Sequence, residues 1–398
     1  MSADRRSRNR RAGVALPVGS RLLHIGPQKT GTSTLQQAFH ETRCQLRKLG
    51  VHYAGSSRQH RVAAAAAVKD QPLHGNLESS LASWPRLVED VRSSTAERVV
   101  VSAEMFANAP EERIPEVVEK LDPGLHVAVT LRPLVNILPS QWQQYVQNGL
   151  ATPYLCWLRE MFQRRDTTTV TPTFWHRHQH DELVARWARV VGPERVTVVV
   201  ADETERDALL RAFESLLALP TGTLVAGGRD NRSLTASEAE VVRTINVLYK
   251  ENGWPKDIYE KVLRQAFHNG IKTRTPARGE PRLATPQWAR EQATEVAGEI
   301  VTGLRELARS GVRVIGDLDR LQAPPPRADG QEVCEPPTAV GTDVAAKVAI
   351  ELVRASVIEP KRSVLRLLQQ RAPAASVADP GQRRSMHLLR RRLRRLLG

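Results

Sequence analysis

Residues 22–35 read LLHIGPQKTGTSTL, an order of residue types that predicts a binding loop for a charged ester. A short apolar run ends at Gly26, and Lys29 is followed by glycine and hydroxyl residues that open a helix. The first N–H groups of a helix have no intrahelical partner, and the helix dipole makes their surroundings positive. A phosphate or sulfate ester binds readily at such a helix N-terminus. We therefore expect an oxyanion site in which Lys29 supplies a mobile positive charge.

A helix is expected directly after this loop, because apolar residues recur there at spacings of three and four. The members of this stripe are Leu35, Phe39, Thr42, Leu46 and Leu49. Gly50 follows them and is the residue type that most often ends a helix. The pattern thus predicts one helix that begins in the loop and ends at Gly50.

Five short runs predict β-strands buried on both faces of a sheet, because they are almost continuously apolar or β-branched. They are Leu22–Ile25, Val99–Val101, Val127–Leu131, Val196–Val200 and Val312–Ile315. Arg313 interrupts the last run, which we therefore expect at an edge of the sheet. Helical patterns separate the runs, so the expected fold class is α/β, a three-layer, P-loop-like parallel sheet flanked by helices.

The 398 residues are enough for one large domain with appendages. We expect a disordered basic arm at 1–20, an α/β domain at 21–320, and a Pro-rich linker with a basic, helical C-terminal extension at 321–398. Two amphipathic helices are expected in this extension. The first contains Val344, Val348 and Leu352, and the second contains Met386, Leu389, Leu393 and Leu396.

The net charge of +15 comes partly from arginines that crowd both ends of the chain. They suit peripheral contact with a membrane or a polyanion, or simply a solvated, poorly ordered tail, which we favour. We expect no specific nucleic-acid partner. Cys44, Cys156 and Cys334 lie far apart and form no CxxC pair. Without a disulfide framework, a signal peptide or a long apolar span, the sequence indicates a cytoplasmic protein.

The loop differs from that of nucleoside-triphosphate-binding proteins, in which the pattern G-x-x-x-x-G-K-[ST] places lysine after the second glycine. Here Lys29 precedes Gly31, and the order is G-x-x-K-T-G-T-S. This order resembles the 5′-phosphosulfate-binding loop of sulfotransferases, which use the donor 3′-phosphoadenosine 5′-phosphosulfate (PAPS). The resemblance implies that the 5′-phosphate contacts Thr30, Gly31, Thr32, Ser33 and Thr34.

A second anion-binding signal follows the run Val127–Leu131. Arg132 stands at the carboxyl end of this predicted strand, and Ser140 lies eight residues further on. Pro139 is expected near the start of the helix that contains Ser140. An arginine fork and a hydroxyl suit one phosphate. The R-x7-S arrangement resembles the 3′-phosphate-binding segment of sulfotransferases, and two such segments in order are far more specific than either alone.

The resemblance covers about residues 20–320 and includes Asn231-Arg232-Ser233-Leu234 before a helix, as in bacterial members of the family. The sequence departs from cytosolic animal sulfotransferases because their RKG-type loop, which closes over the nucleotide, is not evident. Residues 231–233 or the loop Arg274–Arg278 are the alternatives for that role.

Glu104 is the candidate general base, which takes the acceptor's proton during transfer. It follows Val99-Val100-Val101-Ser102-Ala103, just past the carboxyl end of a predicted strand. Lys29 and Arg132 also follow strand ends, and open α/β sheets bind ligands in the crevice outside those ends. Partial desolvation beside a lysine and a sulfonate would suit a carboxylate that accepts a proton.

The histidines are expected to be structural. His24 lies inside the first predicted strand, where a core histidine is the better interpretation. His176, His178 and His180 alternate in WHRHQH, a spacing that could bind a metal on a strand. Their neighbours match no ligand pattern, so we expect a loop near the acceptor entrance and no metal site.

The sequence therefore predicts a PAPS-dependent sulfotransferase with Lys29 and Glu104 as catalytic residues and PAPS as co-substrate. The acceptor is a small molecule or glycan, with carbohydrate or glycolipid favoured by the resemblance. Two alternatives stay open. One is a nucleotide-dependent P-loop kinase, for which Asp202 is the best candidate Mg²⁺ ligand. The other is a catalytically silent P-loop protein recruited to a membrane or polyanion by its basic tail.

Overall fold

The computed structural model describes residues 14–354, except 70–80, 123, 202–204, 206, 228–231, 256–258, 270, 272–273, 323–331, 336 and 338. The chain divides into two compact units. The first unit contains Met1–Trp142, Thr152–Asn231 and Leu283–Cys334, and the second contains Gln143–Ala151, Arg232–Arg282 and Glu335–Gly398. All residues of the expected anion-binding loop belong to the first unit.

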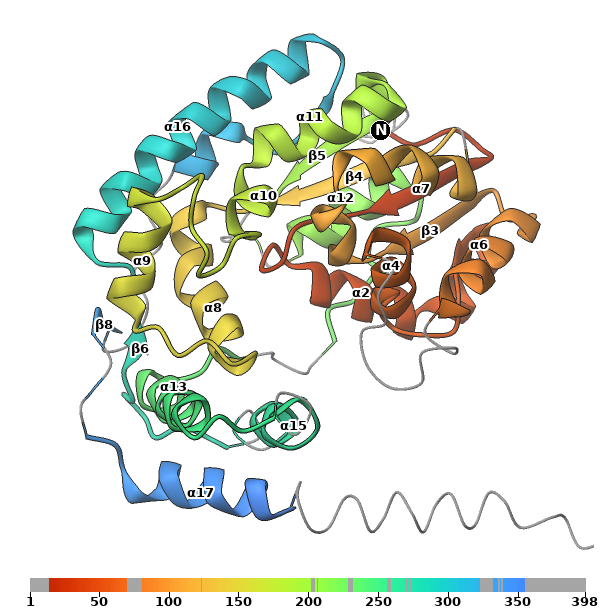
Figure 1. Ribbon diagram of the computed structural model, residues 1–398. Coiled ribbons are helices and arrows are strands. Elements are labelled where there is room, and N and C mark those ends of the chain that lie inside the picture. The colour runs from red at the N-terminus through yellow and green to blue at the C-terminus, as the bar shows by residue number, and fades with distance from the viewer. Residues whose placement is uncertain are drawn as a thin grey trace, which may run out of the picture. The chain divides into compact units, whose positions relative to one another are not determined.

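A six-stranded sheet forms the centre of the first unit, with the strand order β2-β3-β1-β4-β5-β7 (Figure 1). The strands in this order are Val51–Tyr53, Arg98–Ser102, Ser20–His24, His126–Leu131, Val196–Val200 and Arg313–Ile315. Every neighbouring pair is parallel. The predicted α/β class is confirmed, and β7, interrupted by Arg313, lies at an edge as expected. The opposite edge strand β2 was missed in the sequence.

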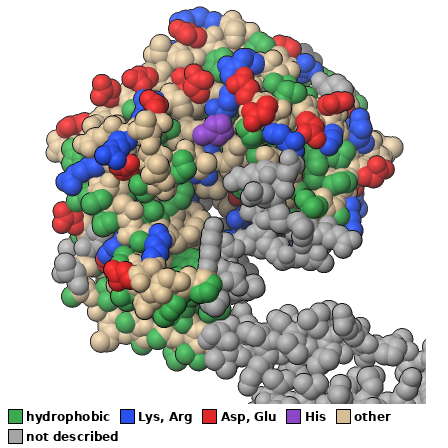
Figure 2. All heavy atoms as spheres, viewed as in Figure 1, with side chains coloured by type: hydrophobic (Ala, Val, Ile, Leu, Met, Phe, Trp, Pro, Cys, Tyr) green, Lys and Arg blue, Asp and Glu red, His purple; other side chains and the backbone are tan. Residues whose placement is uncertain are grey.

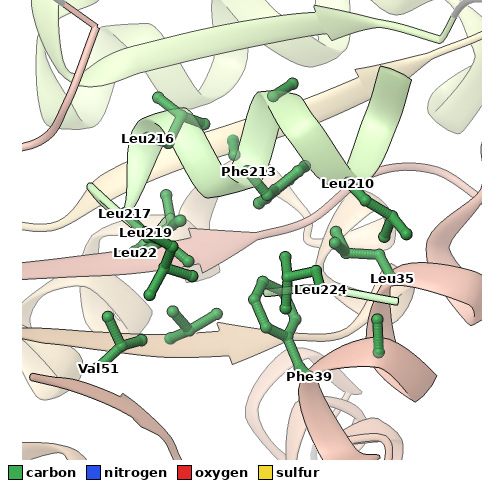
Figure 3. Packing of buried hydrophobic residues seen from close by; sticks show 14 of the residues in the cluster. Leu22, Leu35, Phe39, Val51, Leu210, Phe213, Leu216, Leu217, Leu219 and Leu224 are labelled. Atoms are coloured by element: carbon green, nitrogen blue, oxygen red, sulfur yellow. The ribbon is translucent and has the colours of Figure 1, made fainter. Parts of the chain in front are cut away.

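Helices cover both faces of this sheet, which explains why its inner strands are apolar on both sides (Figure 1). On one face, Leu22 packs with Phe39 of α2 (Thr32–Glu41) and Phe213 of α12 (Ala208–Leu216), as Figure 3 shows. On the other face, α11 (His180–Val191) packs on β4 and β5. Successive strand residues point to opposite faces, so the continuous apolar runs fill both layers.

The remaining described helices belong to one or the other of the two units, and α8 (Leu134–Gln147) contributes residues to both. They are α3 Arg43–Lys48, α4 Arg61–Lys69, α6 Ser83–Ser93, α7 Ile114–Leu121, α8 Leu134–Gln147, α9 Tyr154–Gln163, α10 Phe174–His178, α13 Ala236–Glu251, α15 Arg264–Asn269, α16 Gln287–Arg309 and α17 Thr342–Val353. Two-residue strands β6 (Arg282–Leu283) and β8 (Glu332–Val333) pair separately. None of the described helices is both long enough and apolar enough to cross a membrane.

The helix expected to run from the loop to Gly50 is two helices, α2 and α3, separated at Thr42. The Thr42 hydroxyl donates to the carbonyl of Ala38 at 2.7 Å, and Thr42 leaves the helical conformation with ψ 8°. Threonine side chains that bond back to the preceding turn compete with the helix ladder, which accounts for the break. Gly50 ends the second helix with φ +76°, as predicted.

Residues 14–19, which were expected to belong to a disordered arm, are ordered within the first unit. Leu16 is buried, its N–H donates to Leu216 O at 2.8 Å, and Arg98 Nε donates to Leu16 O at 2.9 Å. Residues 1–13 lie outside the described part of the chain.

The C-terminal extension is described only as far as residue 354. Helix α17 confirms the first helix expected there, with Val344 and Val348 buried. The arginine-rich tail and its second expected helix lie outside the described residues. On the face drawn in Figure 2, basic and acidic side chains are interspersed. Because the tail lies outside the described residues, its contact with a membrane or polyanion stays a prediction.

The sequence predicted a loop at His176–His180, and this prediction is wrong. The segment forms the helix α10 and the start of α11. His178 and His180 are buried, with ring centroids 5.9 Å apart. Six histidines of the first unit have a pKa that burial lowers, among them the half-buried His176. The pKa is about 3 for His24, about 4 for His60, His126 and His180, and well below 6.5 for His178.

These buried histidines predict a loss of stability in mild acid. In the unfolded chain they take up protons near pH 6.5, whereas the folded protein keeps them neutral. Their folded pKa is depressed, so the stabilisation is full above about pH 6.5 and is lost as the pH falls towards about 4. As the pH falls through this window, each such histidine lowers the free energy of unfolding by about 1.4 kcal/mol per pH unit.

Urea unfolding between pH 7.5 and 4.5 measures this slope. His126 bonds Thr197 Oγ1 at 2.8 Å, and His126→Gln keeps an amide there but removes one titrating group. As the pH falls, we expect the free energy of unfolding of the variant to decrease less steeply than that of wild type. The difference in slope is the contribution of one histidine, about 1.4 kcal/mol per pH unit. Equal slopes in the two proteins would contradict this account.

Two glycines in α16 give a second stability prediction. A Cβ at Gly298 would have Gln322 Oε1 as its nearest neighbour, at 4.0 Å, whereas a Cβ at Gly303 would lie 2.6 Å from Asp181 Oδ2. We expect Gly298→Ala to raise the free energy of unfolding by about 0.5–1 kcal/mol, because alanine favours a helix interior. Gly303→Ala, the matched variant, should gain less or lose stability because Asp181 must move. Chemical denaturation of both variants checks the ranking.

Candidate functional site

The predicted loop leaves the carboxyl end of β1 and ends in the first turn of α2. Lys29 has φ +71° and Gly31 φ +89°, both in the left-handed region. The N–H groups of Thr34 and Leu35 donate to Gly31 O at 3.1 and 3.2 Å and form the first turn. The N–H groups just before them therefore belong to the helix N-terminus, the part of a helix that favours an anion.

Close packing explains the glycine at the start of this loop. A Cβ at Gly26 would overlap the hydroxyl of Thr130 on β4 and would lie 2.6 Å from His24 Nε2. The Thr30 hydroxyl, further along the loop, donates to Pro27 O at 2.7 Å and lies 2.7 Å from Thr130 Oγ1. The loop is thus pressed against the neighbouring strand, which only a residue without a side chain permits.

The second predicted segment meets this loop. The Arg132 guanidinium, just past β4, donates to the carbonyl of Lys29 at 3.4 Å. On α8, the Gln141 amide donates to Gln28 Oε1 at 3.2 Å. Its neighbour Ser140 donates to Ile137 O at 3.0 Å. The structure therefore brings Lys29 and Arg132 together and places Ser140 on the helix that contacts the loop.

The position of Pro139 differs from the expectation that it lies near a helix start. Helix α8 begins at Leu134, so Pro139 lies inside it. A proline there cannot donate to the carbonyl four residues earlier, which is that of Val135. The buried hydroxyl of Thr285 donates to Val135 O at 3.0 Å instead. This replacement lets the helix continue to the turn that carries Ser140.

The sheet topology singles out the same position. The connection from β1 leads towards β2 at one edge, and the connection from β4 leads towards β5 and the other edge. Since β1 and β4 are neighbours, their carboxyl ends form a switch point. Open α/β sheets bind ligands there, and the Lys29 loop and Arg132 follow these two strands.

Glu104 begins a short 3-10 helix, Glu104–Asn108, one residue after β3, and its side chain is half-buried. The Gln36 amide of α2 donates to Glu104 Oε2 at 3.2 Å and to Ser102 O at 3.3 Å. Because β3 neighbours β1, the three predicted charged residues Lys29, Glu104 and Arg132 follow adjacent parallel strands. The catalytic roles assigned to them stay predictions.

Sequence analysis missed a group of buried polar residues beneath the loop. His24 bonds Ser102 Oγ through Nδ1 at 2.8 Å and Thr130 Oγ1 through Nε2 at 3.1 Å. Gln36 donates to Ser102 Oγ at 3.2 Å. The expectation that His24 is a core residue is confirmed. These residues could have been found in the sequence, because His24, Ser102 and Thr130 are each a polar residue near the carboxyl end of an apolar strand.

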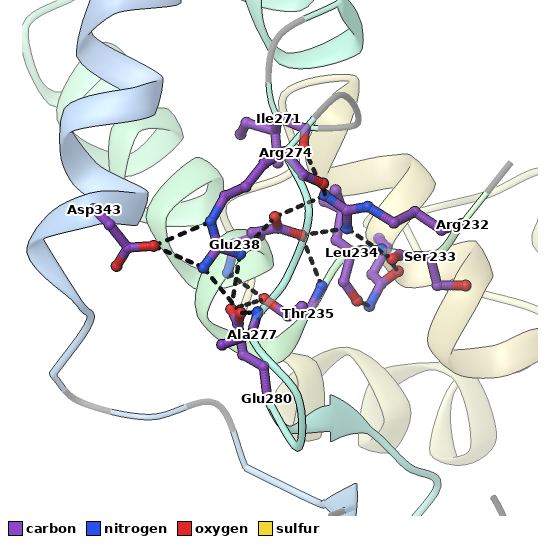
Figure 4. Close-up of polar contacts among 11 residues, drawn as sticks. Arg232, Ser233, Leu234, Thr235, Glu238, Ile271, Arg274, Ala277, Glu280 and Asp343 are labelled. Carbon is purple, nitrogen blue, oxygen red and sulfur yellow. Dashed lines mark hydrogen bonds and ion pairs between the residues drawn. The ribbon is translucent and has the colours of Figure 1, made fainter. Parts of the chain in front are cut away.

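The arginines considered for closing over the nucleotide form ion pairs in the second unit (Figure 4). Arg232 donates to both oxygens of the fully buried Glu238 at 2.7 and 2.8 Å. Arg274 pairs with Glu238, Glu280 and Asp343 at 3.1, 2.9 and 2.8 Å. Hydrogen bonding to Glu280 raises the pKa of Arg274. These contacts hold the start of α13 and of α17, and Asn231 lies outside the described residues.

The described residues contain no cluster of three or more His, Cys, Asp or Glu side chains that suits a metal ion. Asp202, the candidate Mg²⁺ ligand of the kinase alternative, lies outside the described residues. Lys29 and Arg132 are the basic residues that follow β1 and β4 at the switch point.

The chain matches no protein-family model, and no curated protein matches it. A solved structure similar to it is the sulfotransferase from Alicyclobacillus acidocaldarius, with 15% sequence identity and a TM-score of 0.34. The similarity covers 60% of this chain and 96% of that chain. The assignment of a function therefore rests on the residues of the site.

Proposed function

We propose that this protein is a PAPS-dependent sulfotransferase. The observation that carries the proposal is the contact between the two segments expected to bind anions, because Arg132 donates to the carbonyl of Lys29 at 3.4 Å at the switch point. A donor with phosphates at both its 5′ and 3′ positions needs two such segments side by side. The order of Lys29 and Gly31, opposite to that of nucleoside-triphosphate loops, favours PAPS over ATP.

In this mechanism the protein positions the donor and stabilises charge. Backbone N–H groups of residues 30–33 hold the 5′-phosphate, whereas the N–H of Thr34, also expected there, donates to Gly31 O in the first turn of α2. Arg132 with Ser140 holds the 3′-phosphate. The acceptor oxygen or nitrogen forms a bond to sulfur while the bond to the bridging phosphate oxygen breaks. Lys29 neutralises that oxygen, adenosine 3′,5′-bisphosphate leaves, and Glu104 takes the acceptor's proton. Alignment in line supplies much of the acceleration.

The acceptor that we propose is a hydroxyl or amine of a carbohydrate or glycolipid. This choice follows from Glu104, because carbohydrate-type sulfotransferases often use a glutamate as the base. The kinase alternative requires a Mg²⁺ ligand near the phosphates. The silent-scaffold alternative requires that Lys29 and Glu104 have no role in turnover.

Ligand binding by the purified protein tests the donor class. We expect adenosine 3′,5′-bisphosphate, without metal, to raise the thermal midpoint, because a ligand at about a hundred times its Kd stabilises the folded state by about 2.7 kcal/mol. Arg132→Ala should abolish most of this shift. The control is Arg305→Ala. Arg305 lies on α16 and pairs with Asp319 at 2.6 Å, and its loss should leave the shift intact.

Other outcomes of this experiment assign the alternatives. A shift with ATP and Mg²⁺ alone would favour the kinase, and no shift with any nucleotide would favour the silent scaffold. A full shift in the Arg132→Ala variant would remove that residue from the donor site.

Substitutions of Lys29 test the chemical step. We expect Lys29→Ala and Lys29→Gly to lower sulfate transfer from radiolabelled PAPS to a panel of monosaccharides by at least about a hundredfold. The two variants should differ in stability, because φ +71° at this position strains alanine but not glycine. Lys29→Gly should be more stable than Lys29→Ala by about 1 kcal/mol. Wild-type rates in either variant would refute the role of the lysine.

A further inference from the structure

A row of polar side chains crosses the middle of the sheet beneath the predicted loop. Ser102 of β3, His24 of β1 and Thr130 of β4 are all completely buried. His24 stands in the middle, 2.8 Å from Ser102 Oγ and 3.1 Å from Thr130 Oγ1. Leucine or valine at these positions would avoid the cost of burying polar groups. The row therefore calls for an explanation other than stability.

Both ends of the row reach residues of the proposed site. At one end, Thr130 Oγ1 lies 2.7 Å from the hydroxyl of Thr30 in the phosphate loop. At the other end, the Gln36 amide donates both to Ser102 Oγ and to Glu104 Oε2, each at 3.2 Å. One chain of hydrogen bonds thus joins the loop that would hold the donor to the carboxylate that would accept the proton.

The direction of each hydrogen bond in this chain follows from its neighbours. The Thr30 hydroxyl donates to Pro27 O at 2.7 Å, so the hydrogen between the two threonines comes from Thr130. Thr130 then accepts from the Nε2–H of His24. The Nδ1 lone pair of His24 therefore accepts from the Ser102 hydroxyl.

The Ser102 end of the chain is fixed in the same way. The two hydrogens of the Gln36 amide are shared among three acceptors, Ser102 Oγ, Ser102 O and Glu104 Oε2, so Ser102 Oγ accepts from Gln36 and donates to His24. The backbone N–H of Ser102 donates to His60 Nδ1 at 3.0 Å, and His60 Nε2 lies 2.6 Å from Ala54 O. His60 is therefore also the Nε2–H tautomer and holds Ser102 from a second side.

A neutral His24 in one tautomer is essential to this order. A protonated ring would donate at both nitrogens, so the Ser102 hydroxyl would lose its acceptor. Burial lowers the pKa of His24 to about 3, and the edge of the ring faces Phe213 at a centroid distance of 5.1 Å. The ring therefore stays neutral and keeps one orientation across the pH range in which enzymes of this kind work.

We propose that His24 is a positioning residue that couples the phosphate loop to Glu104, through Thr130 and Thr30 on one side and through Ser102 and Gln36 on the other. The inference rests on the proposed function, since it assigns the two ends their roles. It distinguishes the two nitrogens of one ring: Nε2 positions the donor, and Nδ1 positions the base.

Two amide substitutions separate these nitrogens. In His24→Asn, the amide oxygen takes the place of Nδ1 and accepts from Ser102, but the side chain is too short to reach Thr130. In His24→Gln, the amide nitrogen takes the place of Nε2 and donates to Thr130, while Ser102 loses its acceptor. Each variant removes one half of the chain and keeps the other.

The measurements are calorimetric affinity for adenosine 3′,5′-bisphosphate and the rate of sulfate release from saturating PAPS, with water as the acceptor. We expect His24→Asn to weaken the affinity by about tenfold, the value of one good hydrogen bond, with a smaller effect on the saturating rate. We expect His24→Gln to lower the saturating rate by about tenfold or more, with a smaller effect on affinity. Glu104→Gln provides the reference for loss of the base.

Equal losses in both parameters for both variants would overturn the coupling and leave His24 a core residue. The ring ¹⁵N shifts of His24 in the wild-type protein provide a test that requires no variant. Nε2–H from pH 5 to 8 supports the chain, and Nδ1–H or a titration step near pH 6.5 overturns it. Failure of the wild-type protein to bind the bisphosphate would instead refute the proposed function itself.

Discussion

The close approach of Gly26 to Thr130 is the constraint on which the rest of the site depends. Any side chain at Gly26 would overlap the Thr130 hydroxyl, so the chain can leave β1 along the surface of β4 only with glycine there. This path places Thr30 within 2.7 Å of Thr130 and the carbonyl of Lys29 within 3.4 Å of Arg132. The loop and the predicted segment with Arg132 meet because the parallel strands β1 and β4 are hydrogen-bonded neighbours.

Parallel pairing also determines which residues can cooperate. In a parallel sheet all carboxyl ends lie at one edge, and β1 has β3 and β4 as its two neighbours. Side chains that follow these three strands are therefore close in space, although Lys29 lies 75 positions before Glu104 and 103 before Arg132 in the chain. The polar row formed by Ser102, His24 and Thr130 runs across the same three strands. Its satisfied hydrogen bonds offset the cost of burying it and specify one arrangement of the loop.

Much of this fold could be predicted from the sequence, because a strand buried on both faces must be apolar at nearly every position. The exceptions depend on tertiary contacts. Strand β2 has three residues, with His52 in the middle, and its pairing with β3 and the 2.9 Å contact of His52 with Asp90 leave no periodic signal. The interruption of the first helix at Thr42 arises from one side-chain hydrogen bond, which helix periodicity does not reveal.

The candidate site was only partly predictable for a related reason. Lys29, Glu104 and Arg132 stand at strand ends, where charge interrupts an apolar run, and this local contrast is visible in a sequence. Thr130 lies inside its run and gains importance only through its register with β1. Pro139 was expected at a helix start because proline has no N–H to donate and is tolerated best in the first turn of a helix. In the structure, Thr285, far along the chain, donates to Val135 O in its place.

The backbone of Lys29 provides an independent argument about its role. A non-glycine residue with φ +71° costs about 1 kcal/mol or more relative to glycine, and such strain is retained where other requirements determine the residue. Only two described non-glycine residues have positive φ, Lys29 and Ala218. At Gly31, two positions later, the chain uses the unstrained residue. The backbone path alone would be served better by glycine at both positions, so the strained lysine supports the proposal that its amine is needed at this place.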